Sequence, residues 1–257
     1  MRIAQLAPLA ESVPPKGYGG SEQVVSDLTE ELVKAGHEVT LFAAADSETS
    51  ARLVGCAPQG LRTSDISPTR FPAYDLTAVL RLEAMQDQFD IVHNHMGYTA
   101  LPVLRQLKIP TVTTIHNPVK DYCREVFFAC KELPYVAISN AYKRLNYPDQ
   151  LNYVATVHNG INIHDYVYDD SVHRTNLLFV GRICKDKGTL EAIQIAERVG
   201  MPIILAGKVD NNDRDYFEKE IKPHLQKSRC QIYRRGKRSG KKRPLYIGGG
   251  HTLPDRF

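Results

Sequence analysis

Two segments of this sequence end in histidines that directly follow apolar runs. His93, Asn94 and His95 close one run, and His116, followed by Asn117, closes another. An imidazole held in a fixed position can hydrogen-bond a substrate or move a proton near neutral pH. We expect His116 to be functional and His93 to be structural, and both roles stay open for His95. Metal ligation is less favoured, because no carboxylate or third histidine accompanies the pair at ligand spacing.

A glycine-rich turn follows the first apolar run of the chain. Residues 14–22 read Pro-Pro-Lys-Gly-Tyr-Gly-Gly-Ser-Glu and contain the adjacent glycines Gly19 and Gly20. Glycine lets a ligand approach the backbone closely, and the free N–H groups at the start of a helix suit a phosphate. The pair lacks the spacing of the dinucleotide-binding fingerprint, so a tight turn between a strand and a helix is the alternative.

Two later segments carry polar groups where strands are expected to end. Arg182 and Lys187 lie in the loop 181–188, where a bidentate guanidinium and a point charge would clamp an anion. Asn159 and Gly160 form an Asn-Gly pair, which is a turn signal in its own right. A solvated loop and a simple turn are the respective alternatives.

The elements that must position these residues alternate between strands and helices. Strands are predicted over 3–8, 39–44, 89–93, 111–116, 135–139, 153–158, 177–180 and 202–206. Helices are predicted from an N-cap at Ser21 to a stop at Gly36, and over 76–88, 99–107, 121–130, 141–147, 189–199 and 213–225. Residues 45–75 are predicted as loop with at most one short strand. This alternation predicts an α/β fold with parallel sheets and ligands at the carboxyl ends of the strands.

Composition and cysteine spacing narrow the class of protein. Of the 257 residues, 42% are hydrophobic and 24% charged, which is typical of a soluble globular protein and excludes disorder throughout. No apolar run reaches the roughly 20 residues of a membrane span. The five cysteines are scattered without a C-x-x-C pair, so neither a disulfide framework nor a zinc site is indicated. The expected location is the cytoplasm, since the first residues do not read as a signal peptide.

The charge is unevenly distributed. Residues 227–257 carry ten basic side chains and one acidic one, whereas the rest of the chain carries 23 basic and 28 acidic ones. The basic tail is therefore +9 and the remainder −5. One interpretation is an arm for nucleic acid or an anionic membrane. The other is that the tail does not belong to the same design.

Taken in order, the motifs resemble those of the retaining, nucleotide-sugar-dependent glycosyltransferases of family 4, in the glycogen synthase-like group. The matching segments are 18–22 (YGGSE), 36–42 (GHEVTLF), 90–95 (DIVHNH), 114–117 (TIHN), 137–139 (AIS), 157–161 (VHNGI), 179–182 (FVGR) and 187–188 (KG). The resemblance covers residues 1–226. It implies the GT-B fold, with a Rossmann-like acceptor-side domain over 1–165 and a Rossmann-like donor-side domain over 166–226, here incomplete.

The resemblance also implies roles for the residues singled out above. Gly19 and Gly20 would approach the donor phosphates and the acceptor, and His116 would contact the donor sugar near the reacting carbon. Arg182 and Lys187 would hold the diphosphate, and no cofactor or metal would be required. The remaining cleft candidates are His95, Asn117, Ser139, Asn159 and Gly160. The partners implied are a nucleotide sugar and an unidentified glycan, lipid or small-molecule acceptor, with no nucleic acid expected. A peripheral membrane contact and the oligomeric state stay open.

The resemblance stops after residue 226. The family continues with a strand and then a loop with two glutamates that holds the ribose and faces the donor sugar, and no Glu follows Glu220 in this chain. Codons for parts of residues 227–257, read one base later, are compatible with family-like sequence. We therefore expect the tail to be out of frame or disordered, which a fresh nucleotide read across codons 220–257 would test.

Three other functions remain open. The chain could be a non-catalytic remnant or binding domain of a glycosyltransferase, because it lacks the acidic donor loop. A sugar-nucleotide epimerase of the same fold is a second alternative, since fold alone does not choose the chemistry. A nucleic-acid binder acting through the basic tail ranks last, because the tail has no regular basic helix.

Overall fold

The computed structural model describes residues 1–163, 175–225, 230–233, 245–247 and 251–253. The chain divides into two compact units, Met1–Ile161 and Asn162–Phe257. The sequence placed this division at residue 165, a few residues further along.

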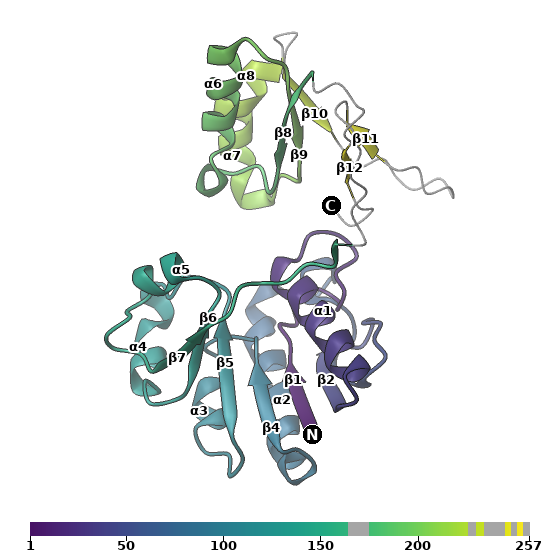
Figure 1. Ribbon diagram of the computed structural model, residues 1–257, viewed down its shortest axis with the longest axis vertical. Coiled ribbons are helices and arrows are strands. Elements are labelled where there is room, and N and C mark those ends of the chain that lie inside the picture. The colour runs from purple at the N-terminus through teal and green to yellow at the C-terminus, as the bar shows by residue number, and fades with distance from the viewer. Residues whose placement is uncertain (164–174, 226–229, 234–244, 248–250, 254–257) are drawn as a thin grey trace. The chain divides into compact units, whose positions relative to one another are not determined.

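The first unit is built on a seven-stranded parallel sheet (Figure 1). Its strands are β1 (Arg2–Leu6), β2 (Glu38–Ala44), β3 (Arg52–Ala57), β4 (Ile91–Asn94), β5 (Thr111–Ile115), β6 (Tyr135–Ala137) and β7 (Tyr153–Thr156). They lie in the order β3-β2-β1-β4-β5-β6-β7, and every adjacent pair is parallel. The predicted α/β class is thus confirmed. The order reverses between β1 and β4, the switch point at which such sheets bind ligands.

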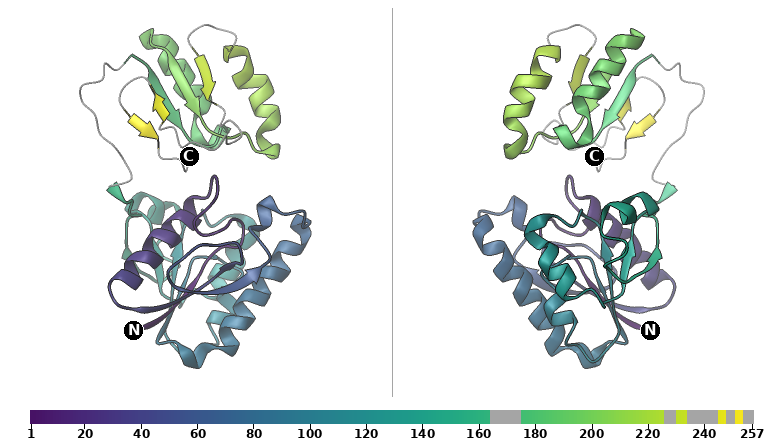
Figure 2. Two further views of the ribbon diagram at one scale, coloured as in Figure 1. Left: turned by 90° about the vertical axis from the view of Figure 1, so that its right-hand side faces the viewer. Right: turned by 90° about the vertical axis from the view of Figure 1, so that its left-hand side faces the viewer.

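Helices cover both faces of this sheet. They are α1 (Gly20–Lys34), α2 (Phe71–Ala84), α3 (Leu101–Leu104), α4 (Asp121–Ala129) and α5 (Asn140–Leu145), with short 3-10 turns at Leu61–Thr63, Pro68–Arg70 and Gln86–Gln88. Figure 2 shows α1 and α2 on opposite sides of the sheet. Val25 of α1 packs with Leu41 and Ala43, whereas Leu82 of α2 packs with Phe42. Alternation along β2 therefore separates an α1 face from an α2 face.

Strand register decides which polar side chains share the α1 face. Gln5 of β1 is paired with Leu41 on one side and with His93 on the other. Paired residues of parallel strands point to the same face, and His93 is in turn paired with Val112. Alternation along β4 and β5 then adds three polar residues to this face: His95, Thr114 and His116.

The start of α1 differs from the prediction. Gly19, not Ser21, occupies the N-cap, and no side chain caps the helix. The backbone N–H of Gln23 donates to the Gly19 carbonyl over 3.0 Å and closes the first helical turn. The helix therefore begins two residues earlier than predicted. Ser21 instead lies within the first turn.

The long segment between β2 and β4 also differs in detail. The sequence predicts a helix over 76–88, whereas α2 runs over Phe71–Ala84. Pro72 lies in its first turn, where backbone N–H groups have no partner within the helix, so a proline costs no hydrogen bond. The single short strand allowed within 45–75 is β3, at one edge of the sheet.

The second unit contains a three-stranded parallel sheet. Its strands are β8 (Leu177–Val180), β9 (Ile203–Ala206) and β10 (Cys230–Tyr233), in the order β10-β9-β8. Its helical segments are α6 (Thr189–Val199) and the contiguous α7 (Arg214–Tyr216), a π-helical turn (Phe217–Ile221) and α8 (Lys222–Leu225), after 3-10 turns at Lys185–Lys187 and Asn211–Asp213.

The strand β10 corrects the expectation that the second unit ends at residue 226. The sequence predicts only two βα units here, because the resemblance to the family stops after residue 226. Cys230 is nevertheless buried in the core of this unit and Ile232 packs against it. Burial of these two side chains favours a strand paired with β9.

Most of the basic tail lies outside the described residues. Besides β10, the structure describes only β11 (Leu245–Ile247) and β12 (His251–Leu253), which form an antiparallel pair. The expectation of an out-of-frame or disordered tail, and the alternative of a nucleic-acid-binding arm, otherwise fall outside what the structure describes.

Candidate functional site

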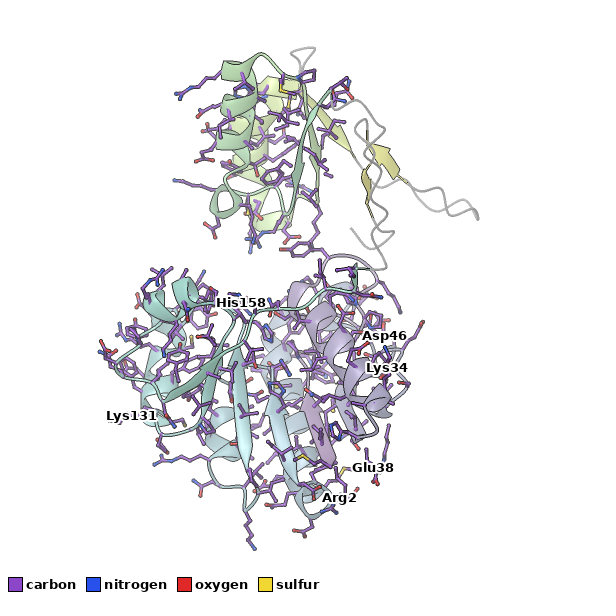
Figure 3. All side chains as sticks on the ribbon, in the orientation of Figure 1. Arg2, Lys34, Glu38, Asp46, Lys131 and His158 are labelled. Atoms are coloured by element: carbon purple, nitrogen blue, oxygen red, sulfur yellow. The ribbon has the colours of Figure 1, made fainter. Side chains whose placement is uncertain are left out.

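The candidate site of the first unit lies at the carboxyl edge of its parallel sheet. Figure 3 labels His158 beyond β7 at this edge, and Arg2 and Glu38 at the opposite edge where β1 and β2 begin. Each candidate residue of this unit follows the carboxyl end of a strand, as the fold requires of a ligand site.

At the switch point, an amide and two imidazoles form a hydrogen-bonded series that we call the histidine file (Gln5, His95 and His116). Gln5 Oε1 lies 2.9 Å from His95 Nε2, and His95 Nδ1 lies 2.8 Å from His116 Nε2. The ring of His93 lies beside that of His95, with centroids 4.0 Å apart, but its Nε2 bonds Thr114 Oγ1 over 2.8 Å. The structure thus joins His95 to His116, and it ties His93 into the sheet as a structural residue would be.

The three histidines are neutral at pH 7. Burial lowers the pKa of His116 to about 4, and burial together with repulsion from His116 lowers the pKa of His93 to about 4. Burial, followed by repulsion from its two neighbours, holds the pKa of His95 well below its usual value. Each ring therefore has one N–H donor and one bare nitrogen acceptor.

This neutrality predicts an acid-sensitive first unit. Folding lowers these pKa values from 6.5 to about 4, so the unfolded chain binds more protons between these two pH values. The contribution of the histidines to the free energy of unfolding is therefore fully present above pH 6.5 and falls as the pH drops towards 4. Each histidine, if it titrates independently, would contribute at most about 3 kcal/mol to the free energy of unfolding. Denaturant unfolding at pH 7.5 and pH 4.5 measures the loss, which should be smaller in His93→Gln. Equal unfolding free energies at the two pH values would contradict the neutral histidine file.

The glycine-rich turn is fastened to the loop after β2. Lys16 Nζ lies 2.8 Å from Asp46 Oδ2, and the backbone N–H of Val13 donates to Ser47 Oγ over 2.9 Å. These bonds hold the turn in one position at the entrance to α1.

The two adjacent glycines of this turn have different structural roles. A Cβ on Gly19 would lie 2.8 Å from Pro15 Cβ, so only glycine fits there. A Cβ on Gly20 would meet no atom within 4 Å, and Gly20 is exposed as the first residue of the 15-residue helix α1. Gly20 therefore presents open backbone at the positive end of a helix dipole, where a phosphate would be stabilised.

Two buried carboxylates lie behind this turn. Glu11 and Glu22 are 5% and 4% exposed, and Arg62 Nη1 lies 3.0 Å from Glu11 Oε1. Burial raises the pKa of Glu22, while backbone N–H groups and the charge of Arg62 oppose that rise. The sequence identified Glu22 only as part of a motif, and the ion pair between Arg62 and Glu11 has no signal in local spacing.

The other candidates of the first unit lie along the same edge. Asn117 is exposed beyond β5, and Asn159 and Gly160 are exposed beyond β7. Ser139 follows β6, and its Oγ accepts from the backbone N–H of Tyr142 over 3.0 Å as the N-cap of α5. The Ser139 hydroxyl thus has a structural partner in addition to any ligand.

In the second unit, the loop after β8 is held against the loop after β9. Gly181 N donates to Ala206 O over 3.0 Å, and Ile183 N donates to Lys208 O over 2.9 Å. A Cβ on Gly207 would lie 1.7 Å from the Gly181 carbonyl oxygen, so no larger residue fits at position 207. This close approach fixes the backbone on either side of Arg182.

Arg182 is oriented by acidic residues that the sequence did not single out. Its Nε lies 3.4 Å from Asp213 Oδ2, its Nη1 lies 3.6 Å from Asp210 Oδ2, and its Nε also donates to Cys184 Sγ over 3.3 Å. The Arg182 side chain is 33% exposed, so part of the guanidinium stays open to solvent. Lys187 is exposed in the turn before α6.

Sequence reasoning also missed Gln5. The available signal was a polar residue within the otherwise apolar run Ile3–Ala7, at a strand that register places next to β4. Asp210 and Asp213 had no such signal, because their contact with Arg182 depends on how the loops after β8 and β9 meet.

Two features are absent from the described parts of the chain. No group of three or more His, Cys, Asp or Glu side chains converges there as metal ligands. None of the helices in those parts is both long and apolar enough to cross a membrane.

Comparison with protein families and curated proteins identifies relatives. A model of glycosyltransferase family 4 matches residues 18–165, which is more than half of the chain. The O-antigen chain mannosyltransferase C of Escherichia coli is 23% identical over an alignment of 219 residues that covers 75% of this chain and 58% of that protein. The chain therefore spans just over half the length of this curated relative.

Solved structures of similar fold are also glycosyltransferases and related enzymes. Sucrose-phosphate synthase from Thermosynechococcus elongatus has a TM-score of 0.68 at 18% identity, over 91% of this chain and 70% of that one. A glycosyltransferase involved in avilamycin A biosynthesis has a TM-score of 0.63 at 22% identity, over 91% and 63%. Anabaena HepE in complex with UDP and glucose has a TM-score of 0.63 at 15% identity, over 90% and 68%. At these identities the likeness concerns the fold, and it confirms the GT-B-like class.

Proposed function

The chain belongs to glycosyltransferase family 4, and we propose that it transfers a hexosyl group from a nucleoside diphosphate sugar to an acceptor, with retention at the anomeric carbon. The mannosyltransferase relative and the Anabaena structure with UDP and glucose support a hexose and a nucleoside diphosphate as the parts of the donor. The acceptor is a glycan, a lipid or a small molecule. We place the reaction in the cytoplasm, which the five free, buried cysteines support.

The observation that carries this proposal is the histidine file at the switch point of the sheet. His116 is bonded to His95 through one ring nitrogen and is partly exposed, so its other nitrogen is available to a ligand. We assign to His116 the contact with the donor sugar near the reacting carbon. Gly20 would bind phosphate through the backbone at the start of α1, and Gly19 holds the turn that presents it.

In the second unit, Arg182 and Lys187 would bind the diphosphate. As the bond between the anomeric carbon and the diphosphate breaks, negative charge grows on the departing group. Fixed cations stabilise that charge more in the transition state than in the ground state, so they increase turnover. Asp210 and Asp213 would keep the guanidinium in place before the donor binds. The proposal requires no metal, because these side chains supply the positive charge.

A panel of donors tests the proposal on the full chain. UDP-, GDP- and ADP-linked glucose and mannose are titrated by calorimetry, and release of the nucleoside diphosphate is followed with and without simple sugar acceptors. Saturable binding of one donor with transfer supports the proposal. Binding without transfer would favour the non-catalytic binding domain, and conversion of a free donor to its epimer would favour the epimerase. Absence of binding by every donor would contradict the proposal.

Gly20→Ala gives a prediction that separates ligand contact from folding. The added methyl group meets no atom within 4 Å, and alanine is the better helix former, so the unfolding free energy should stay equal or rise by about 0.5–1 kcal/mol. The same methyl group would block a phosphate at the backbone, so donor affinity should fall at least tenfold. Calorimetry and thermal unfolding measure the two effects. Unchanged donor affinity would remove Gly20 from the phosphate site.

A further inference from the structure

A buried amide lies at the inner end of the histidine file. Gln5 is fully buried and His95 is 4% exposed, so solvent does not compete for the bond between them. We infer that Gln5 is a positioning residue that fixes the tautomers of His95 and His116, so that His116 presents Nδ1 as a hydrogen-bond acceptor to the ligand. The inference rests on the proposed function only for the nature of that ligand.

The first step follows from the chemistry of the amide. A carbonyl oxygen only accepts hydrogen bonds, and Gln5 Oε1 lies 2.9 Å from His95 Nε2. The proton of this bond must therefore be on His95 Nε2. Since His95 is neutral, its Nδ1 is then a bare acceptor.

The second step passes this choice to His116. The contact of 2.8 Å between His95 Nδ1 and His116 Nε2 needs one proton, and His95 has none to offer there. His116 Nε2 must donate it, and because His116 is also neutral, its Nδ1 has a free lone pair. A ligand group bonded there must supply a hydrogen, as a sugar hydroxyl does and an ether or carbonyl oxygen does not.

Gln5 is a costly residue for a purely structural role. Its Nε2 is buried and has no hydrogen-bond partner among the described residues. A buried donor without a partner destabilises a fold, whereas a methionine of similar length would avoid that cost. The polar end of Gln5 therefore acts through the one bond that it makes, to His95.

Histidine tautomers can be read directly in the full chain labelled with nitrogen-15 at histidine. At pH 7.5, long-range proton–nitrogen spectra should show a protonated, pyrrole-type Nε2 and a bare, pyridine-type Nδ1 for both His95 and His116. In Gln5→Met the acceptor is lost, and a bare Nε2 is less costly than a buried N–H without a partner. The signals of both rings should therefore shift towards the opposite tautomer.

Two further variants keep the test decisive. Gln5→Glu retains an oxygen acceptor, so His95 Nε2 should keep its proton even if Gln5→Met folds poorly. Thr113→Val removes a buried hydrogen bond to Asn94 in the same sheet but on the opposite face, and it should leave the histidine signals unchanged. Identical spectra of Gln5→Met and the wild-type chain would overturn the inference, as would a protonated Nδ1 at His116 in the wild-type chain. No nucleotide sugar is needed, so failure of the proposed function would be seen separately.

Discussion

Arg182→Ala should lower kcat with the chosen donor by about 10²–10³-fold, equivalent to roughly 2.7–4 kcal/mol of lost transition-state stabilisation. The guanidinium is anchored by Asp210 and Asp213 and partly open to solvent, so it is already oriented when negative charge develops on the diphosphate. Lys187→Ala should have a comparable effect through the loss of a point charge. Steady-state kinetics of the purified full chain measure both changes.

Lys185→Ala is the matched control for these variants. Lys185 is exposed in the same short turn as Lys187, so its loss changes the local charge equally without removing a proposed ligand. Arg182→Lys keeps the charge but loses the bidentate fork, and should recover only part of the activity. Because Arg182→Ala removes the guanidinium from Asp213 and Asp210, of which Asp210 still pairs with Lys208, thermal unfolding must accompany the kinetics. An unchanged kcat/KM in a folded Arg182→Ala chain would remove Arg182 from the diphosphate site.

His116→Ala should lower transfer by about 10²-fold while the first unit stays folded. The side chain lies at the open end of the histidine file, and its loss removes one hydrogen bond, which His95 Nδ1 accepts and which a water molecule can replace at this partly exposed edge. The cost in unfolding free energy should therefore be about 1 kcal/mol. Donor turnover and thermal unfolding, measured on the same preparation, separate the two effects.

His37→Ala is the control for His116→Ala. His37 lies at the amino edge of the sheet, next to the start of β2, where its Nδ1 is 3.4 Å from the N-terminal amine. Its replacement should leave turnover unchanged. A collapsed unfolding transition in His116→Ala would support a structural role for that histidine, and full activity in a folded variant would exclude it from the sugar site.

The fold class was within reach of the sequence because the apolar periodicity is strong. Short apolar runs alternate with helical patterns, and that alternation forces parallel strands with crossover helices. Where the periodicity is weak, the observed ends of an element differ from the predicted ones. The helix α2, for example, starts at Phe71 and not at residue 76. The strand β10 was not predicted, because the resemblance to the family stops before it, after residue 226.

The candidate site was only partly predictable. Histidines at strand ends, adjacent glycines and an Arg–Lys loop are local signals, so His116, Gly20 and Arg182 could be named from their neighbours in the sequence. The different roles of Gly19 and Gly20 could not be predicted in this way, because they depend on whether Pro15 lies against the position of an added Cβ atom.

The sequence by itself determined the α/β class, the order of its motifs and the residue types that meet at the carboxyl edge. Only the tertiary structure decided which of those residues are hydrogen-bonded to one another. Gln5 and His95 are 90 positions apart, and their contact depends on the register of β1 against β4. That register is set by packing of both faces of the sheet, which no local pattern encodes. The same burial makes the histidines neutral, and neutrality is what allows one amide to set the protons of the whole histidine file.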